Sequence, residues 1–229
     1  TVLLPDMPTP PGGFPVLYLL HGKGGDHTDW TRLGALEHHV RERYPLCVVM
    51  PSAQHSFYRD MVYGLPYYQY LAYELPEKLA RMLPISQRRE DTFIAGRSMG
   101  GYGAMLLALN QPERFSYAAS VSGALDVYQM MRTHEWPEWK FIFGEDEEYL
   151  GSTGDLVHML GQVKGEKPHL FACCALEDGL TSQNHVFVNR ARELSYDITF
   201  VDGHGCHDWN YGNEMTLRIL DWLPLEQFK

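Results

Sequence analysis

The chain has 229 residues, 45% of them hydrophobic and 21% charged, and carries a formal net charge of −10. These totals suit one globular domain with a substantial core. The acidic balance excludes nucleic acid as a partner, because phosphate binding needs a basic face. No apolar run reaches the roughly 18 to 20 residues that a membrane-spanning helix requires, so no membrane partner is expected either.

The first two predicted strands, residues 1–4 and 15–20, are joined by a loop rich in Pro and Gly. A loop of this length cannot hold a crossover helix, so we expect the two strands to pair antiparallel. The chain also opens almost directly on a strand. We therefore expect a preceding N-terminal strand to be missing, and a signal or a neighbouring domain could have been lost with it.

Five further apolar runs alternate with helical patterns and complete the predicted fold. These strands are residues 46–50, 92–96, 117–122, 169–175 and 197–202. The middle ones are apolar on both faces, as the strands of a covered parallel sheet must be. The alternation predicts an α/β fold with a mostly parallel, doubly wound sheet and helices on both faces, in a single domain over residues 1–229.

Two stretches, residues 67–83 and 183–195, repeat apolar side chains at spacings of three and four, which predicts amphipathic helices. The first buried face is expected to comprise Tyr68, Ala72, Leu75, Leu79 and Met82. The second is expected to comprise Val186, Phe187, Ala191 and Leu194.

Residues 126–164 break the alternation, with two tryptophans, a proline and an acidic run but only short helical patterns. We interpret this stretch as an insertion over the active-site end of the sheet. It is either a surface excursion with a small core of its own or a lid that shapes a pocket, because long excursions in compact domains are often functional.

The most informative stretch is "FIAGRSMGGYGAM", residues 93–105, in which Ser98 lies between Gly96 and Gly100. It falls between a predicted strand and a predicted helix, at the carboxyl end of the sheet where catalytic groups gather. Glycines two residues before and after the serine remove bulk, so that its hydroxyl can stand clear on a strained turn. This pattern predicts a nucleophile elbow. The alternative is a glycine-rich turn with an ordinary N-cap serine.

A serine hydroxyl needs a base, and the loop "VDGHGCHDWNYG" after the last predicted strand supplies His204 and His207. We prefer His207, which directly precedes a helix predicted to begin near Asp208–Trp209, and keep His204 as the alternative. The acid should follow the preceding strand, where Glu177 and Asp178 stand.

Of these two carboxylates we prefer Asp178, with Glu177 as the alternative. Asp155 and Asp202 fit less well, because neither follows a buried strand at the right place in the chain order. A buried carboxylate would fix the tautomer of the imidazole and stabilise the imidazolium that forms.

Acyl transfer also needs donors for the developing oxyanion. One should be the backbone N–H of Met99, directly after the serine, and the other the N–H of Lys23 in the glycine-rich loop after strand 15–20. In the same loop we expect His21 to order the backbone and not to act as a second base.

These motifs resemble the esterase D group of α/β-hydrolases, which includes tributyrin, feruloyl and acetyl-xylan esterases, S-formylglutathione hydrolase and the mycolyltransferases. The segments most similar to the tributyrin esterase branch are "PVLYLLHGKGGDHTDW", "SFYRDMVYG", "YELPEKL", "TFIAGRSMGGYGAMLLAL" and "GCHDW". The resemblance spans nearly the whole chain. It implies Ser98 as nucleophile, Asp178 as acid and His207 as base, with the amides of Lys23 and Met99 as oxyanion donors.

The chain departs from these relatives at two positions. Arg97 stands where they often have histidine or leucine, and Lys23 where they often have an apolar residue. We expect both side chains to point into solvent. The alternative is that their charges favour acidic acyl groups or acidic sugars.

The combined pattern predicts a serine carboxylesterase that cleaves short-chain or aromatic esters (acetyl, butyryl or feruloyl), including esters on carbohydrate, without metal or cofactor. Tyr63 and Trp136 are candidate pocket walls, whereas Trp139 is expected to serve packing. Three rival functions remain. They are an acyltransferase with the same triad, a metal enzyme using Asp202, His204, His207 and Asp208, and a non-catalytic binding module.

The four cysteines show no spacing typical of a disulfide framework or a zinc site. We interpret them as reduced core thiols. They are Cys47, Cys173, Cys174 and Cys206. This favours a cytoplasmic location, with secretion left open by the expected truncation. The aromatic content is compatible with a homo-oligomer.

Overall fold

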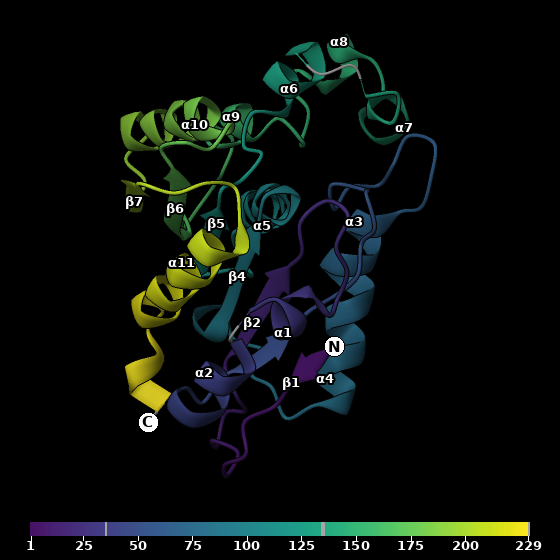
Figure 1. The fold of residues 1–229 in the computed structure, drawn as a ribbon. Coiled ribbons are helices and arrows are strands. Elements are labelled where there is room, and N and C mark those ends of the chain that lie inside the picture. Colours follow the sequence, from purple (N-terminus) through teal and green to yellow (C-terminus); the bar gives the residue numbers. More distant parts are fainter. Residues whose placement is uncertain (35, 134–135, 229) are drawn as a thin grey trace.

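The computed structural model describes residues 1–34, 36–133 and 136–228 (Figure 1). In these residues, seven strands form one sheet in the order β1-β3-β2-β4-β5-β6-β7. Their bounds are β1 Val2–Leu3, β2 Val16–Leu20, β3 Cys47–Val49, β4 Thr92–Arg97, β5 Tyr117–Val121, β6 His169–Ala175 and β7 Ile198–Gly203. Each predicted strand is therefore present, within one or two residues at its ends.

All neighbouring strands pair in parallel except the first. β1 runs antiparallel to β3, with Val2 opposite Val49, and it does not pair with β2. The direction expected for the first strand is right, but its expected partner is wrong. The reason is that β3 takes the position beside β2 through parallel pairing, with Val16 opposite Cys47.

Helices cover both faces of the sheet, as predicted for a doubly wound fold. Alternate residues of β2 show this directly, because Val16, Tyr18 and Leu20 belong to one apolar core and Leu17 and Leu19 to the other. The helices outside the insertion are α1 Asp29–Arg32, α2 Leu36–Arg43, α3 Tyr67–Gln69, α4 Leu75–Met82, α5 Met99–Asn110, α10 Thr181–Glu193 and α11 Trp209–Trp222.

The helix predicted over residues 67–83 is present, but a π-helical segment at Tyr70–Glu74 joins α3 to α4. The predicted buried face fails at its end: Leu79 is buried and Met82 is 76% exposed, while Leu83, directly after α4, packs against the core in its place. The irregularity lies beside Pro76, which has no N–H to donate to the carbonyl of Ala72. That carbonyl instead accepts from Nη1 of Arg114 at 2.6 Å.

The second predicted helical face is also partly wrong. Phe187 and Ala191 are fully buried as expected, whereas Val186 is exposed and Val188 takes its place in the core. A polar residue explains the rotation. Asn184 is buried on the same stripe, where its amide donates to the carbonyl of Gly123 at 2.8 Å, a contact that a pattern of apolar residues cannot reveal.

The described part of the insertion holds four short helices, α6 Val127–Thr133, α7 Trp139–Phe143, α8 Asp146–Tyr149 and α9 Leu156–Met159. In Figure 1, α6, α7 and α8 gather at one end of the molecule, while α9 lies beside α10. Aromatic contacts tie the insertion to the rest: Phe57 meets Trp139 at 5.3 Å and Phe143 at 5.2 Å between ring centroids. The insertion therefore shares the main core of the domain and does not form a small core of its own.

Among the helices of the described residues, none combines the length and the apolar character needed to cross a bilayer.

Candidate active site

The serine elbow is built at the junction of β4 and α5. Ser98 has φ 57° and ψ −118°, a left-handed conformation that a non-glycine residue adopts only under strain. A Cβ at Gly96 would lie 2.2 Å from the carbonyl oxygen of Gly100, and one at Gly100 would lie 2.3 Å from that of Leu20. Both flanking positions therefore require glycine, and the backbone has the form predicted for a nucleophile elbow.

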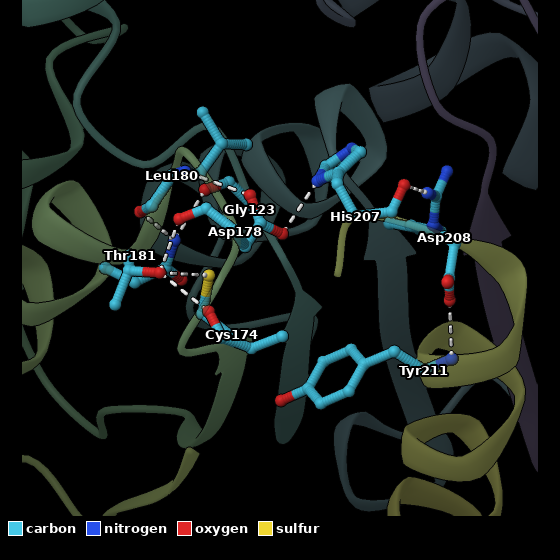
Figure 2. Close-up of polar contacts among 11 residues, drawn as sticks. Gly123, Cys174, Asp178, Leu180, Thr181, His207, Asp208 and Tyr211 are labelled. Atoms are coloured by element: carbon cyan, nitrogen blue, oxygen red, sulfur yellow. Dashed lines mark hydrogen bonds and ion pairs between the residues drawn. The ribbon is translucent and has the colours of Figure 1, made fainter. Parts of the chain in front are cut away.

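A carboxylate and an imidazole meet beside the elbow. Nδ1 of His207, in the loop between β7 and α11, lies 2.8 Å from Oδ2 of Asp178, in the loop after β6 (Figure 2). The Asp178 side chain is 1% exposed and that of His207 is 35% exposed. Because an ionised carboxylate only accepts hydrogen bonds, Nδ1 carries the proton and Nε2 is left to act as a base.

Asp178 is held in its ionised form by its neighbours. Burial on its own raises its pKa, but the hydrogen bonds from His207 and from the backbone N–H of Leu180 outweigh burial and lower it overall. The Leu180 N–H donates to Oδ1 at 2.9 Å, so each carboxylate oxygen has a donor. This arrangement fixes the imidazole in a single tautomer.

Ser98 and His207 are brought to the same region without a direct bond. Among the described residues no hydrogen bond joins their side chains, but Nη2 of Arg97, the residue before the serine, donates to the carbonyl of His207 at 2.9 Å. Hydrogen bonds between a nucleophile and its base are often long or unformed before substrate binds. The lack of a direct bond is therefore compatible with catalysis.

The two residues kept as alternatives pair with each other. His204 Nδ1 lies 2.9 Å from Oε1 of Glu177, and Oε2 of the same carboxylate accepts the N–H of Gly205 at 2.7 Å. The His204 side chain is 92% exposed, and the hydrogen bond to Glu177 raises its pKa. The pair with a buried carboxylate is thus formed by the preferred residues, Asp178 and His207.

The predicted oxyanion donors flank the serine. Met99 is the first residue of α5, where backbone N–H groups have no acceptor within the helix. The loop that holds Lys23 passes beside the elbow, since a Cβ at Gly22 would lie 3.5 Å from Cβ of Ser98. In the described part of the chain, neither of these two N–H groups donates to another protein group.

His21 orders this loop, in agreement with its predicted role. Its Nδ1 bonds the carbonyl of Gly22 at 2.8 Å, and its Nε2 accepts the N–H of Ala53 at 3.0 Å. The hydroxyl of Tyr58 donates to the carbonyl of His21 at 2.8 Å. Burial lowers the pKa of this imidazole, which favours the neutral form that Nε2 needs in order to accept the N–H of Ala53.

The expectation that Lys23 and Arg97 point into solvent is wrong. Nζ of Lys23 donates to Oε1 of Glu138 at 2.8 Å and lies 3.4 Å from the ring centre of Trp136. Arg97 bonds the carbonyl of His207 and packs over an aromatic ring. Lys23 thus meets a carboxylate and an aromatic face, and Arg97 meets a carbonyl and an aromatic face. All of these partners lie far away in the sequence, which is why the expectation failed.

The two predicted pocket walls lie on the insertion side of the site. Trp136 stacks on Trp139, with ring centroids 4.9 Å apart, and Trp139 is buried as expected. Tyr63 is 70% exposed, and its backbone N–H donates to the carbonyl of Phe141 in α7 at 2.9 Å. A hollow of about 420 Å³ near the oxyanion loop is lined by other residues, namely Gly24, Gly25, Gln54, His55 and Met61.

Gln54, His55 and Met61 are not among the site residues that the sequence predicts. The available signal is their position in "SAQHSFYRDM", directly after strand 46–50 and therefore at the carboxyl edge of the sheet.

The interpretation of all four cysteines as core thiols holds for three of them. Cys47, Cys173 and Cys174 are buried, and burial raises the pKa of Cys47 and of Cys174 to about 12. Cys206 is exposed instead, because it lies in the glycine-containing loop that carries His207.

Three of the four side chains of the rival metal site have separate partners. His207 bonds Asp178, His204 bonds Glu177, and the Asp208 side chain caps α11 by accepting the N–H of Tyr211 at 3.0 Å. Within the described residues, no three histidine, cysteine, aspartate or glutamate side chains are grouped so as to hold a metal ion.

A parallel sheet of this order, with a serine elbow after β4 and a carboxylate–imidazole pair beyond β6 and β7, defines the α/β-hydrolase class of serine hydrolases. The chain belongs to the esterase family whose model is described as "Putative esterase", which matches residues 1–215. It is thus a serine carboxylic ester hydrolase, and the predicted resemblance to esterase D-like enzymes is confirmed.

Individual relatives agree with this assignment. The chain is 31% identical to an acetyl esterase of Caldicellulosiruptor saccharolyticus, over 90% of this chain and 82% of that protein. It is similar to the substrate-bound structure of FphF, a fluorophosphonate-binding serine hydrolase of Staphylococcus aureus, with a TM-score of 0.88 and 31% identity over 97% of this chain and 90% of that one. A shorter similarity, 36% over 52% of this chain, links it to 39% of the diacylglycerol acyltransferase/mycolyltransferase Ag85B of Mycobacterium avium.

Proposed function

We propose that this enzyme hydrolyses short-chain carboxylic esters, acetyl esters above all, with Ser98 as nucleophile, His207 as base and Asp178 as the orienting acid. The observation that carries the proposal is the contact of His207 with the buried Asp178 at 2.8 Å, beside a serine held in a left-handed turn. Strain at a non-glycine residue persists only where the surroundings enforce it, and it is typical of functional sites.

The mechanism follows from these positions. His207 Nε2 takes the proton of Ser98 as Oγ attacks the ester carbonyl, and the oxyanion receives hydrogen bonds from the N–H groups of Lys23 and Met99. His207 then returns the proton to the departing alcohol, which leaves an acyl group on the serine. Water, deprotonated by the same imidazole, releases the carboxylic acid and restores the enzyme.

The charges around the site argue for a neutral substrate. The ammonium of Lys23 is paired with Glu138, and the guanidinium of Arg97 is held by a carbonyl and an aromatic ring, so neither is poised for an acidic acyl group or an acidic sugar. The hollow beside the oxyanion loop is lined by the amide of Gln54, the imidazole of His55 and the thioether of Met61. Such a lining suits an alcohol group with several hydroxyls, such as a sugar. The acetyl esterase relative supports acetyl as the acyl group.

A substrate panel tests this function. We expect hydrolysis of p-nitrophenyl acetate, slower cleavage of the butyrate and of a feruloyl ester, and release of acetate from acetylated xylan. Ser98→Ala should abolish all of these activities. An enzyme whose hydrolysis survives Ser98→Ala would contradict the proposal.

The acyltransferase remains a second candidate because of the similarity to Ag85B, which covers 39% of that protein. The same acyl group on Ser98 would then pass to an alcohol in place of water. Adding a sugar or glycerol to the p-nitrophenyl acetate reaction and measuring acetylated alcohol against acetate separates the two. We expect acetate to predominate.

A further inference from the structure

Arg97 links the nucleophile to the segment that carries the base. It is the last residue of β4, directly before Ser98, and its Nη2 donates to the backbone carbonyl of His207 at 2.9 Å. One side chain therefore connects the elbow to the backbone of the residue whose imidazole must reach the serine.

The guanidinium lies in a site shaped to hold it. It packs over the ring of Trp209 at 5.1 Å, and Trp209 in turn meets Trp30 edge-on at 5.0 Å. A Cβ at Gly212 would lie 3.3 Å from Cδ of Arg97, so the absence of a side chain there leaves room for the arginine. Burial lowers the pKa of Arg97, while the carboxylates of Asp178, Asp208 and Asp29 favour its charged form.

The loop that carries His207 needs such a contact. It contains Gly205 at φ 146°, a conformation open to glycine, and its other side is held by the exposed Glu177. Exposed ion pairs of this kind contribute little to stability. With no bond from His207 to Ser98, the position of the imidazole depends on Asp178 on one side and on the backbone contact of Arg97 on the other.

We propose that Arg97 is a positioning residue, which fixes the backbone of His207 so that Nε2 faces the oxygen of Ser98. The inference rests on the proposed roles of Ser98 and His207. This role differs from both expectations drawn from the sequence, in which Arg97 either points into solvent or favours an acidic substrate.

The test compares Arg97→Met and Arg97→Lys with the wild type on p-nitrophenyl acetate. Misplacing a catalytic group by about 1 Å can cost about 100-fold in rate, so we expect kcat to fall about 10- to 100-fold in Arg97→Met while KM changes less than about twofold. Labelling of Ser98 by a fluorophosphonate should slow by a similar factor. Arg97→Lys should recover part of the rate, because one donor remains but the planar fork is lost.

Chemical rescue separates positioning from a general loss of stability. Guanidinium ion, at concentrations well below those that unfold proteins, should restore part of the kcat of an Arg97→Ala variant, whereas the same concentration of sodium should not. Arg114→Met is the matched control, because Arg114 also donates to a carbonyl, that of Ala72, and packs over aromatic rings, but it lies away from the triad. Arg114→Met should lower the melting temperature but leave kcat unchanged, and added guanidinium should not raise its kcat.

The outcomes distinguish this inference from the proposed function. Wild-type hydrolysis that is lost in Ser98→Ala, together with unchanged kcat and labelling in both Arg97→Met and Arg97→Lys, would overturn the positioning role and leave the esterase intact. An increase confined to KM, or an equal loss of kcat in Arg114→Met, would also overturn it. Absence of hydrolysis and of Ser98 labelling in the wild type would instead refute the function on which the inference rests.

Discussion

Two segments border Ser98, and they are held in different ways. The loop that carries His207 is anchored by Asp178, which is 1% exposed, and by the half-buried guanidinium of Arg97. The insertion is anchored to the oxyanion loop by the Lys23–Glu138 ion pair, whose side chains are 27% and 40% exposed. On the His207 side the contacts position the chemistry. The Lys23–Glu138 pair instead joins the oxyanion loop to the insertion, which Trp139 and Phe143 otherwise hold in the core. Changes on the first side should therefore appear in kcat, and changes on the second in KM.

The largest effect on the His207 side is expected from Asp178→Asn. The amide presents a different hydrogen-bonding pattern to Nδ1 and favours the wrong tautomer, so kcat on p-nitrophenyl acetate should fall by about 10⁴-fold, by analogy with the same change in serine proteases. Circular dichroism should show an intact fold. A loss smaller than tenfold in a folded variant would contradict the role given to Asp178.

The same carboxylate makes stability depend on pH. Its folded-state pKa lies below the ordinary value of 3.8, so it stabilises the fold above that value and this contribution is lost as the pH falls through the folded-state pKa. Urea unfolding of the wild type and of Asp178→Asn, measured from neutral pH downwards, should give a difference in free energy of unfolding that shrinks below about pH 4. A difference that grows on acidification would contradict the direction of the shift.

A smaller effect is expected on the insertion side from Glu138→Gln. Breaking a half-exposed ion pair costs about 1 kcal/mol at most, which is about fivefold in an equilibrium constant. We therefore expect KM for acetylated xylan or a feruloyl ester to rise up to about fivefold, while kcat on p-nitrophenyl acetate stays within about twofold. Lys140→Gln, which breaks an exposed pair with Glu145 in the same insertion, is the control. If Glu138→Gln lowers kcat and leaves KM unchanged, the two segments do not differ as described.

The smallest effect is expected from Glu177→Gln. His204 has a raised pKa, so its pairing with Glu177 stabilises the loop below the ordinary value of 6.5, and the contribution is lost as the pH rises through the folded-state pKa. Because both side chains are exposed, kcat should change less than about twofold at neutral pH. Titration of the His204 ring by NMR should show a lower pKa in the variant. A large loss of kcat would indicate that the alternative pair takes part in the reaction.

The sheet and the order of its catalytic elements could be predicted from the sequence because they depend on local patterns. Apolar runs bounded by turns define the seven strands, and the glycines around Ser98 mark a turn that only they permit. Chain order pointed to Glu177 and Asp178 together, and the burial of Asp178 supports the preference for it.

The remaining features depend on contacts between distant segments. The partner of β1 and the inward position of Asn184 each follow from a neighbour that is remote in sequence. The directions of Arg97 and Lys23 were wrong for the same reason, since their partners are 110 and 115 residues away. The hollow beside Gln54 and His55 also lacks a periodic signal, because loop residues line it.

The most direct test of the account is to locate the covalent adduct of a fluorophosphonate by peptide mass spectrometry and to measure its rate of formation. The account predicts a single adduct on Ser98, formed more slowly by orders of magnitude in His207→Ala and in Asp178→Asn, but at a normal rate in Glu177→Gln. An adduct on another serine, such as the buried Ser122, or an equal rate in all four proteins, would contradict it.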